Sequence, residues 1–290
     1  MIVIIGGTGT LGSETARQLL AKGHEVRVMT RDPSKADKLK KLGAEIVSGD
    51  LRDTESLGRA VAKADTVIAA AHAMVGRGKE SSAAIDGAGH RALIDAAKKA
   101  RVGHFIYTSV AGASLDHPVD FWRTKAAVEE YLRKSRLDYT IIRPTAFMQL
   151  HAYELIGKAV LSGRRVVLFG AGKNPRNFVA AEDAAQLLVL AAEAGWLRGQ
   201  TLEIGGPENL TSSQVVSAFE KIGRAKAKVT HVPLAVARVM SRVFLPIHSG
   251  VSRVMSGIVV GETTDQRWDP TTHDLPIKLT SLEEWAMRYV

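Results

Sequence analysis

Residues 2–12 read Ile-Val-Ile-Ile-Gly-Gly-Thr-Gly-Thr-Leu-Gly, and this stretch decides the fold. Its four apolar residues predict a buried strand, and the segment from Leu11 to Lys22 has the spacing of an amphipathic helix. The glycines at positions 6, 9 and 12 lie between the two. In that setting, a Gly-x-x-Gly-x-x-Gly pattern is typical of a dinucleotide-binding turn. A purely structural turn is the alternative.

Each glycine of this turn has an expected role. Gly6 allows the tight turn, Gly9 lets the backbone approach a pyrophosphate, and Gly12 lets the helix pack closely on the strand. The amide groups at the start of the helix would meet the negative charge of the phosphates. The expected contact residues are Gly6, Thr8, Gly9, Thr10, Leu11 and Gly12.

Short β-branched runs alternate with helix-like segments through the first half of the chain, which is typical of βαβ units. This alternation predicts an α/β fold with a doubly wound, Rossmann-like parallel sheet and helices on both faces. The expected strands are 2–5, 25–29, 44–47, 66–69, 104–107 and 139–142, and the expected helices are 11–22, 34–41, 85–100 and 122–134.

The alternation becomes irregular after Arg143 and Pro144. We therefore expect two domains: a dinucleotide-binding domain over residues 1–150 and a smaller, partly interleaved substrate-binding region over residues 151–290. Strands are expected near 165–169 and 201–204, separated by helices and by turns rich in glycine and proline.

Composition narrows the class of protein. The 290 residues include no cysteine, which excludes disulfides, thiolate nucleophiles and thiolate-ligated metals. The nine histidines are scattered, so no metal site is predicted. Lysine and arginine outnumber acids 39 to 30, which allows an anionic partner, but only 6% of residues are aromatic and a nucleic-acid partner is not favoured.

No membrane-spanning segment or targeting signal is predicted, because no apolar run approaches the roughly 18–20 residues that a bilayer span needs. We therefore expect a cytoplasmic protein that acts on a small molecule. Residues 221–260 contain seven lysines or arginines and no acid. Arg238 and Arg242 would share one face of a helix over 234–244. A solvated face is favoured there over a peripheral membrane or protein contact. The sequence leaves the oligomeric state open.

The end of the second strand decides which cofactor is expected. An acid there binds the adenosine ribose of NAD, whereas an arginine pairs with the 2′-phosphate of NADP. Arg31 occupies that place, so NADP(H) is favoured over NAD. Asp32 competes as a ribose ligand, but Asp32-Pro33-Ser34 is more typical of a helix cap followed by proline in the first turn.

Several motifs together resemble the NmrA-like group of atypical short-chain dehydrogenases, a group that includes quinone reductases, isoflavone-type reductases and non-catalytic redox sensors. The resemblance covers nearly the whole chain. Its carriers are residues 6–12, Thr30-Arg31, Gly49-Asp50-Leu51, Tyr107-Thr108-Ser109, Lys125 with Glu129, 138–145, Phe147-Met148 and 178–183.

The resemblance implies further contacts. Asp50 and Leu51 would lie at the adenine, Ala69, Ala70 and Ala71 along the cofactor, and Pro144 and Thr145 beside the nicotinamide. Lys125 would hold the ribose and stabilise charge, although a solvated helix lysine is the alternative. Ser109 would donate a hydrogen bond to the substrate. His72 and His151 are further candidates, each more readily explained as an ordinary loop or helix residue.

One departure from the family pattern bears on the reaction. The family's Tyr-x-x-x-Lys motif is here Phe121-Trp122-Arg123-Thr124-Lys125, and phenylalanine has no proton to give to a carbonyl. Two functions remain. The first is an NAD(P)H-dependent oxidoreductase that reduces a small apolar carbonyl or quinone without the tyrosine. The second is a non-catalytic NADP(H)-binding redox sensor or assembly and regulatory protein.

Overall fold

The computed structural model describes residues 1–272 and 275–289, and the chain divides into two compact units. Unit 1 comprises Met1–Arg143 and Ala184–Glu203, and unit 2 comprises Pro144–Asp183 and the chain from Ile204 onward. The division near residue 144 follows the loss of regular alternation in the sequence. Residues 184–203 belong to unit 1, although they come from the second half of the chain. They supply most of a helix and the edge strand of the sheet of unit 1.

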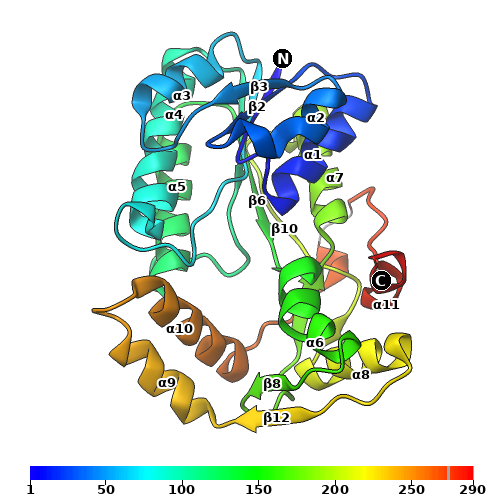
Figure 1. Ribbon diagram of the computed structural model, residues 1–290. Coiled ribbons are helices and arrows are strands. Elements are labelled where there is room, and N and C mark those ends of the chain that lie inside the picture. The colour runs from blue at the N-terminus through cyan, green and yellow to red at the C-terminus, as the bar shows by residue number, and fades with distance from the viewer. Residues whose placement is uncertain (273–274, 290) are drawn as a thin grey trace. The chain divides into compact units, whose positions relative to one another are not determined.

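Unit 1 is built on a seven-stranded sheet, some strands of which are labelled in Figure 1. The strand order is β10-β6-β5-β4-β1-β2-β3. The strands are β1 (Ile2–Ile5), β2 (Val26–Thr30), β3 (Glu45–Ser48), β4 (Thr66–Ala69), β5 (His104–Thr108), β6 (Tyr139–Pro144) and β10 (Thr201–Ile204). From β3 to β6 every pair is parallel. The bonds from the Ile141 amide to the Gln200 carbonyl and from the Thr145 amide to the Ile204 carbonyl advance in the same direction, so β10 is parallel too. The predicted doubly wound α/β fold is confirmed.

Helices connect these strands. They are α1 (Thr10–Ala21), α2 (Asp37–Lys41), α3 (Thr54–Val61), α4 (His90–Lys99), α5 (Asp120–Lys134) and α7 (Ala181–Glu193). The helix expected over 34–41 is split: a 3-10 turn, η1 (Pro33–Ala36), precedes α2. The Asp32 carboxylate accepts a hydrogen bond from the Ser34 amide at 3.2 Å, so the predicted cap is confirmed. The helix expected over 85–100 begins as a π-helix, η3 (Ala83–Gly89), and continues as α4.

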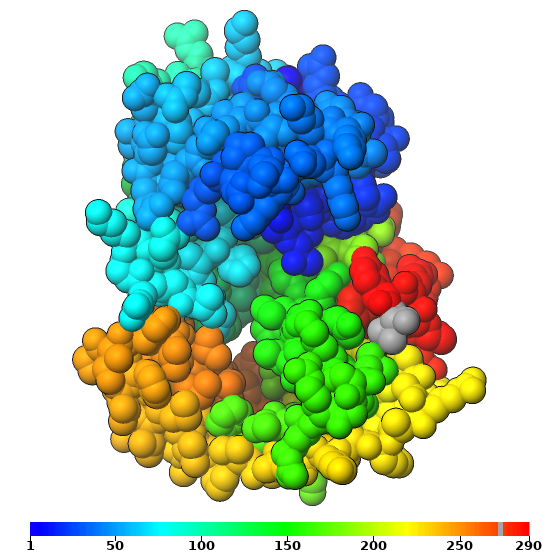
Figure 2. All heavy atoms as spheres, in the orientation of Figure 1, coloured from blue at the N-terminus to red at the C-terminus, as the bar shows by residue number. Residues whose placement is uncertain are grey.

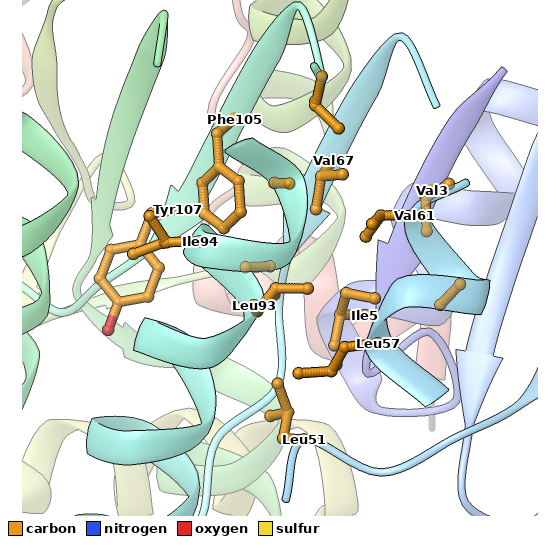
Figure 3. Packing of buried hydrophobic residues seen from close by; sticks show 14 of the residues in the cluster. Val3, Ile5, Leu51, Leu57, Val61, Val67, Leu93, Ile94, Phe105 and Tyr107 are labelled. Carbon is orange, nitrogen blue, oxygen red and sulfur yellow. The ribbon is translucent and has the colours of Figure 1, made fainter. Parts of the chain in front are cut away.

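Apolar side chains fill the space between one face of this sheet and helices α3 and α4. Figure 3 shows Phe105 and Val67 from the strands facing Leu93 and Ile94 of α4. All four are fully buried. Because a parallel sheet is covered on both faces, its strands are nearly continuous apolar runs, which is why they were visible in the sequence.

Unit 2 is less regular and contains two small sheets. The first has the order β11-β9-β7, and the second pairs β12 with β8 in parallel. Its elements are β7 (Ala146–Phe147), π-helix η4 (Met148–Gly157), α6 (Lys158–Leu161), β8 (Val166–Phe169), β9 (Arg176–Val179), β11 (Asn209–Leu210), α8 (Ser212–Gly223), β12 (Val229–Val232), α9 (Leu234–Val243), α10 (Ser249–Thr263) and α11 (Leu282–Tyr289). Around Phe219 and Trp285, α8 and α11 share a core with η4 and β8.

The turn between β1 and α1 has no room for side chains at Gly6, Gly7 and Gly12. Gly6 has a φ of +82°, a region that favours glycine, and a Cβ there would lie 2.8 Å from the Ala71 backbone. A Cβ on Gly12 would lie 2.4 Å from the Gly6 carbonyl oxygen. The first turn of α1 therefore rests directly on the end of β1.

Two histidines lie inside unit 1. His90 is fully buried on α4, and burial, reinforced by the positive charge of Lys125, lowers its pKa to about 4. His104 on β5 lies 2.9 Å from the Thr140 hydroxyl, and burial, with Arg198 nearby, lowers its pKa to about 4 as well. Both rings are therefore neutral in the folded protein at neutral pH.

Mild acid should destabilise unit 1. Between pH 6.5 and pH 4 an unfolded histidine binds a proton that these folded histidines do not, so the free energy of unfolding falls as the pH drops. Between pH 7 and pH 5 each contributes a loss of about 2 kcal/mol. Urea unfolding at the two pH values measures this loss. His104→Gln, which keeps a hydrogen-bond donor, should reduce it, and the exposed control His231→Gln should not. An equal loss in both variants would contradict the explanation.

Gly12→Ala should lower the free energy of unfolding by about 1–3 kcal/mol, because the added methyl group forces α1 away from β1. Gly58→Ala in α3 is the matched control, since nothing lies within 4 Å of its added Cβ. Alanine is the better helix former, so the control should be neutral or stabilising by about 0.5–1 kcal/mol. Thermal or urea unfolding compares the two, and equal destabilisation would show that the close packing is not the cause.

Candidate functional site

Most of the predicted cofactor residues lie at one edge of the sheet in unit 1. The glycine turn follows β1, Arg31 follows β2, Asp50 follows β3, and Ala70 follows β4. Because these strands are parallel neighbours, their carboxyl ends meet at this edge, where open α/β sheets bind ligands. Direct contacts join the segments: the Gly6 amide donates to the Met29 carbonyl at 3.3 Å, and the Ala70 amide to the Ile5 carbonyl at 2.9 Å.

The helix α1 begins at this edge, directly after Gly9. The amide groups of its first turn have no acceptor within the helix, which leaves donors available at a positive helix end. A Cβ on Gly9 would meet only the Gly6 carbonyl oxygen, at 3.4 Å, so packing inside the protein does not demand glycine there. The Thr8 hydroxyl lies 3.2 Å from the Thr30 hydroxyl. Leu11 is buried, so only its backbone faces this edge as a possible donor.

A network of alternating charges follows β2 and β3. Arg31 pairs with Glu80 at 2.5 Å, Glu80 pairs with Arg52 at 2.5 Å, and Arg52 makes a two-point contact with Asp50 at 2.6 and 2.9 Å. The hydrogen bond from Arg52 is the main reason why the pKa of Asp50 lies below its usual value. Glu80 thus connects two arginines that come from different strand ends.

A pocket of about 250 Å³ opens beside this network. It is lined by Arg31, Ser48, Gly49, Asp50, Asp53, Ser56 and Arg59. Two of the predicted cofactor residues, Arg31 and Asp50, therefore share one pocket. The side chain of Leu51, which was expected at the adenine, is buried in the hydrophobic core instead, and only its backbone can contribute at this edge.

Lys125 is not a solvated helix lysine. Its side chain is 2% exposed, and its ammonium donates to the Thr108 carbonyl at 3.1 Å. The Asp86 carboxylate lies 3.4 Å from the ammonium nitrogen. The rings of Tyr107 and Phe121 have their centroids at 5.0 and 5.8 Å. Burial lowers the pKa of Lys125, and the charge of Asp86 opposes that shift.

Asp86 connects two parts of unit 1. One carboxylate oxygen faces Lys125 on α5, and the other accepts a hydrogen bond from the Ala73 amide at 3.1 Å. Ala73 lies in the segment after β4, two residues beyond the predicted cofactor contact Ala71. The side chain of Asp86 is fully buried, so its charge is balanced mainly by Lys125. Asp86 thereby fixes both the loop and the lysine.

Four buried hydroxyl groups near these elements have no partner within residues 1–272 and 275–289. They belong to Tyr107 and Thr108 in β5, to Ser109 directly after it, and to Ser82 directly before η3. Leaving a buried polar group without a hydrogen bond costs about 1–3 kcal/mol. A bound molecule is one way to satisfy such groups, and the contribution of Ser109 to a site stays a prediction.

The remaining predicted residues are placed as follows. Ala69 is the buried last residue of β4. Pro144 ends β6, and the Thr145 hydroxyl, which belongs to unit 2, donates to the Asn177 side chain at 2.9 Å. His72 is exposed in unit 1, whereas the His151 ring contacts the Phe147 carbonyl in unit 2. Within the part of the chain that the structure describes, no group of three or more histidines and acids is arranged to hold a metal ion.

Sequence reasoning missed Asp86, Glu80 and Arg52. Glu80 lies between β4 and η3 in a segment without a regular pattern, and Asp86 lies within the helix expected over 85–100. Arg52 follows the recognised Gly49-Asp50-Leu51 motif by one residue. The one sequence feature that pointed to Asp86 was its position, three residues before Gly89, at the start of a helix face that is otherwise apolar. Nothing in the sequence pairs Asp86 with Lys125, because the two residues are 39 positions apart and a helix and a strand lie between them.

Comparison with known proteins agrees with the fold. The structure superimposes on a triphenylmethane reductase from Citrobacter complexed with NADP(H) with a TM-score of 0.79 and 19% identity, covering 100% of this chain and 99% of that one. An NADPH-dependent quinone oxidoreductase from Escherichia coli complexed with NADPH gives a TM-score of 0.76 and 23% identity, covering 100% and 99%.

Sequence relatives are more varied in function. The photosystem II assembly factor Ycf39 of Synechocystis is 31% identical over 245 residues, which cover 82% of this chain and 72% of the relative. An NAD(P)H azoreductase of Xenophilus azovorans is 28% identical over 241 residues, covering 82% and 79%. The model of the NmrA-like family matches residues 1–286, almost the entire chain. With this match added to the glycine turn and the doubly wound sheet, the chain belongs to the NmrA-like family.

Proposed function

We propose that the protein binds NADP(H) at the carboxyl edge of the unit 1 sheet and transfers hydride to a small conjugated substrate such as a quinone. The observation that carries the proposal is the glycine turn at the start of α1 with Arg31 at the end of the neighbouring strand. A helix N-terminus favours a pyrophosphate, and a guanidinium favours a 2′-phosphate. The reductases with similar folds, which were solved with NADP(H) or NADPH, support the choice of cofactor.

The residues present fit such a cofactor. Gly9 leaves space for close approach, and the buried Ser109 hydroxyl has no protein partner among the described residues. The backbone of residues 8–12 would hold the pyrophosphate, Arg31 the 2′-phosphate, and Asp50 with the Leu51 backbone the adenosine. Ala69, Ala70 and Ala71 would lie along the cofactor, with Pro144 and Thr145 toward the nicotinamide. When bound, the reduced nicotinamide supplies hydride.

The substrate class follows from Lys125 and Phe121. No tyrosine is available at position 121 to protonate a carbonyl, so the substrate must tolerate developing negative charge. Delocalisation over a quinone or an azo group provides that tolerance. Lys125 has three N–H donors, one of which is engaged by Thr108, and its charge is held in place by Asp86. A fixed positive charge in a buried environment stabilises a developing anion more than the same charge in water would.

A second candidate function is supported by one specific observation. Ycf39 of Synechocystis, at 31% identity, is an assembly factor. Together with the absence of tyrosine at position 121, this favours a protein that binds NADP(H) and acts on a protein assembly without turnover. The two functions differ in a simple readout. An enzyme consumes NADPH when quinones or azo dyes are added, whereas an assembly protein binds NADPH tightly and consumes none across the panel.

Arg31→Ala should weaken NADPH binding by about 10- to 100-fold and leave NADH binding unchanged, because only NADPH carries the phosphate that pairs with the guanidinium. Fluorescence titration with both cofactors measures the two dissociation constants. Lys35→Ala, at an exposed lysine nearby, is the control. Tighter binding of NADH than of NADPH to the unaltered protein, or an equal loss of both in Arg31→Ala, would refute the NADP(H) preference.

Glu80→Gln should strengthen NADPH binding by about three- to tenfold. The Glu80 carboxylate pairs with Arg31 and Arg52, so it competes with a phosphate for the same guanidinium groups. The double variant Arg31→Ala with Glu80→Gln should lose most of that gain. If Glu80→Gln strengthens NADH and NADPH binding equally, the carboxylate is not acting through the 2′-phosphate.

Removal of the Lys125 charge should lower turnover at least about 100-fold. Because Lys125→Met alone would leave Asp86 buried and unpaired, the variant to use is Lys125→Met with Asp86→Asn, which removes both charges. Lys134→Met on the exposed side of the same helix is the matched control. NADPH consumption with a quinone panel is the readout, and thermal unfolding verifies the fold. Unchanged turnover in the double variant would exclude Lys125 from the reaction.

A further inference from the structure

Helix α9 has two apolar faces, and only one of them is covered. Its inner face packs on α10, as the helical pair at the lower left of Figure 1 shows. Ala237 is fully buried there, and the Ser252 hydroxyl of α10 donates to the Ser241 carbonyl of α9 at 2.6 Å. These contacts account for the inner apolar side chains of the helix. They do not account for the valines on the opposite side.

The second face, which we call the α9 outer face, consists of Val236, Val239 and Val243 on the helix and Leu245 and Ile247 in the turn that follows. The three valines are spaced by three and four residues, so they form one stripe along the helix. Val239 is 59% exposed, Leu245 64% and Ile247 63%. The segment containing them is gold to orange in Figure 2 and lies at the surface in that view.

This clustering is unusual within the molecule. The described residues include 15 large hydrophobic side chains that are exposed, and five of these fall between positions 236 and 247. Single exposed apolar residues are normal, but a contiguous group marks a binding surface. The stripe therefore requires an explanation that the packing of α9 on α10 does not supply.

Positive charge runs along the edge of the same stripe. Arg238 and Arg242 are both exposed, four residues apart, and therefore side by side on the helix. Among the described residues, neither makes an ion pair with an acid. Elsewhere in the acid-free segment Lys221–Val260, Arg253 is buried and Lys221 and Lys226 pair with acids outside the segment, so the charge of this face comes from the two helix arginines. The α9 outer face is thus apolar along the valine stripe and positively charged along the neighbouring row formed by Arg238 and Arg242.

We propose that the α9 outer face docks on an anionic lipid surface, with the valines, Leu245 and Ile247 in the headgroup boundary and the two arginines on lipid phosphates. Helices that lie in a membrane interface combine an apolar stripe with flanking lysines or arginines in this way. A second copy of this chain is the less favourable occupant, because a symmetric contact would bring two pairs of arginines together. No helix among the described residues is long and apolar enough to cross a bilayer.

Sedimentation of the full chain with lipid vesicles tests the proposal. The protein should bind vesicles of phosphatidylcholine mixed with phosphatidylglycerol, bind pure phosphatidylcholine at least about tenfold more weakly, and be released by salt. Val239→Asp should reduce binding to the mixed vesicles about tenfold or more, and so should Arg238→Gln with Arg242→Gln. Leu155→Asp, at an exposed leucine of η4, is the matched control and should bind as the unaltered protein does.

The remaining outcomes overturn the proposal. Equal binding to neutral and anionic vesicles would show that the arginines do not recognise lipid phosphates. No binding to either kind of vesicle would refute a lipid contact and favour a protein partner for the α9 outer face. Light scattering distinguishes a further case: a dimer of the unaltered chain that Val239→Asp converts to a monomer would assign the face to a second copy. Thermal unfolding of each variant establishes that the fold is retained.

Discussion

The packing of α1 against the end of β1 is the constraint on which the candidate site depends. The approach of Gly12 to the Gly6 carbonyl leaves no space for a side chain, so the helix starts at the sheet edge itself. A longer or wider turn would carry the helix N-terminus away from the ends of β2 and β3. The positions of Arg31 and Asp50 relative to the turn then follow from the parallel register of the strands. One close backbone contact therefore sets the geometry of the whole edge.

The strands of unit 1 were predictable because they are buried on both faces and are therefore nearly continuous apolar runs. Strands 2–5, 66–69 and 201–204 agree with β1, β4 and β10 residue for residue. In unit 2 only β8 was predicted, near 165–169, and β7, β9, β11 and β12 were missed. β7 and β11 have two residues each, too few to show a period. The π-helical turns at 83–89 and 148–157 were missed as well, because the difference from an α-helix lies in the hydrogen bonds and not in the spacing of apolar residues.

The predicted site residues that adjoin strand ends were easier to place than the groups that surround them. Arg31, Asp50 and Lys125 were named from local motifs, whereas their partners Glu80, Arg52 and Asp86 depend on contacts between segments. The role expected for Lys125 stays a prediction, and the structure adds that its side chain is buried and paired with Asp86. The basic residues that exceed the acids occur in two places. Arg31 and Arg52 belong to the charged network at the sheet edge, and Arg238 and Arg242 lie on α9.

The shared carboxylate of Asp86 has a thermodynamic consequence. It serves the Ala73 amide and the Lys125 ammonium at once, so the position of the loop after β4 and the proton affinity of the lysine are linked quantities. If the Ala73 amide moved away, the Asp86 carboxylate would lose a hydrogen bond and interact more strongly with the Lys125 ammonium. The pKa of Lys125 would then rise. By reciprocity, loss of the lysine proton strengthens the hold of Asp86 on the loop. The hydrogen bond to the Ala73 amide and the proton affinity of Lys125 are therefore coupled through a single carboxylate.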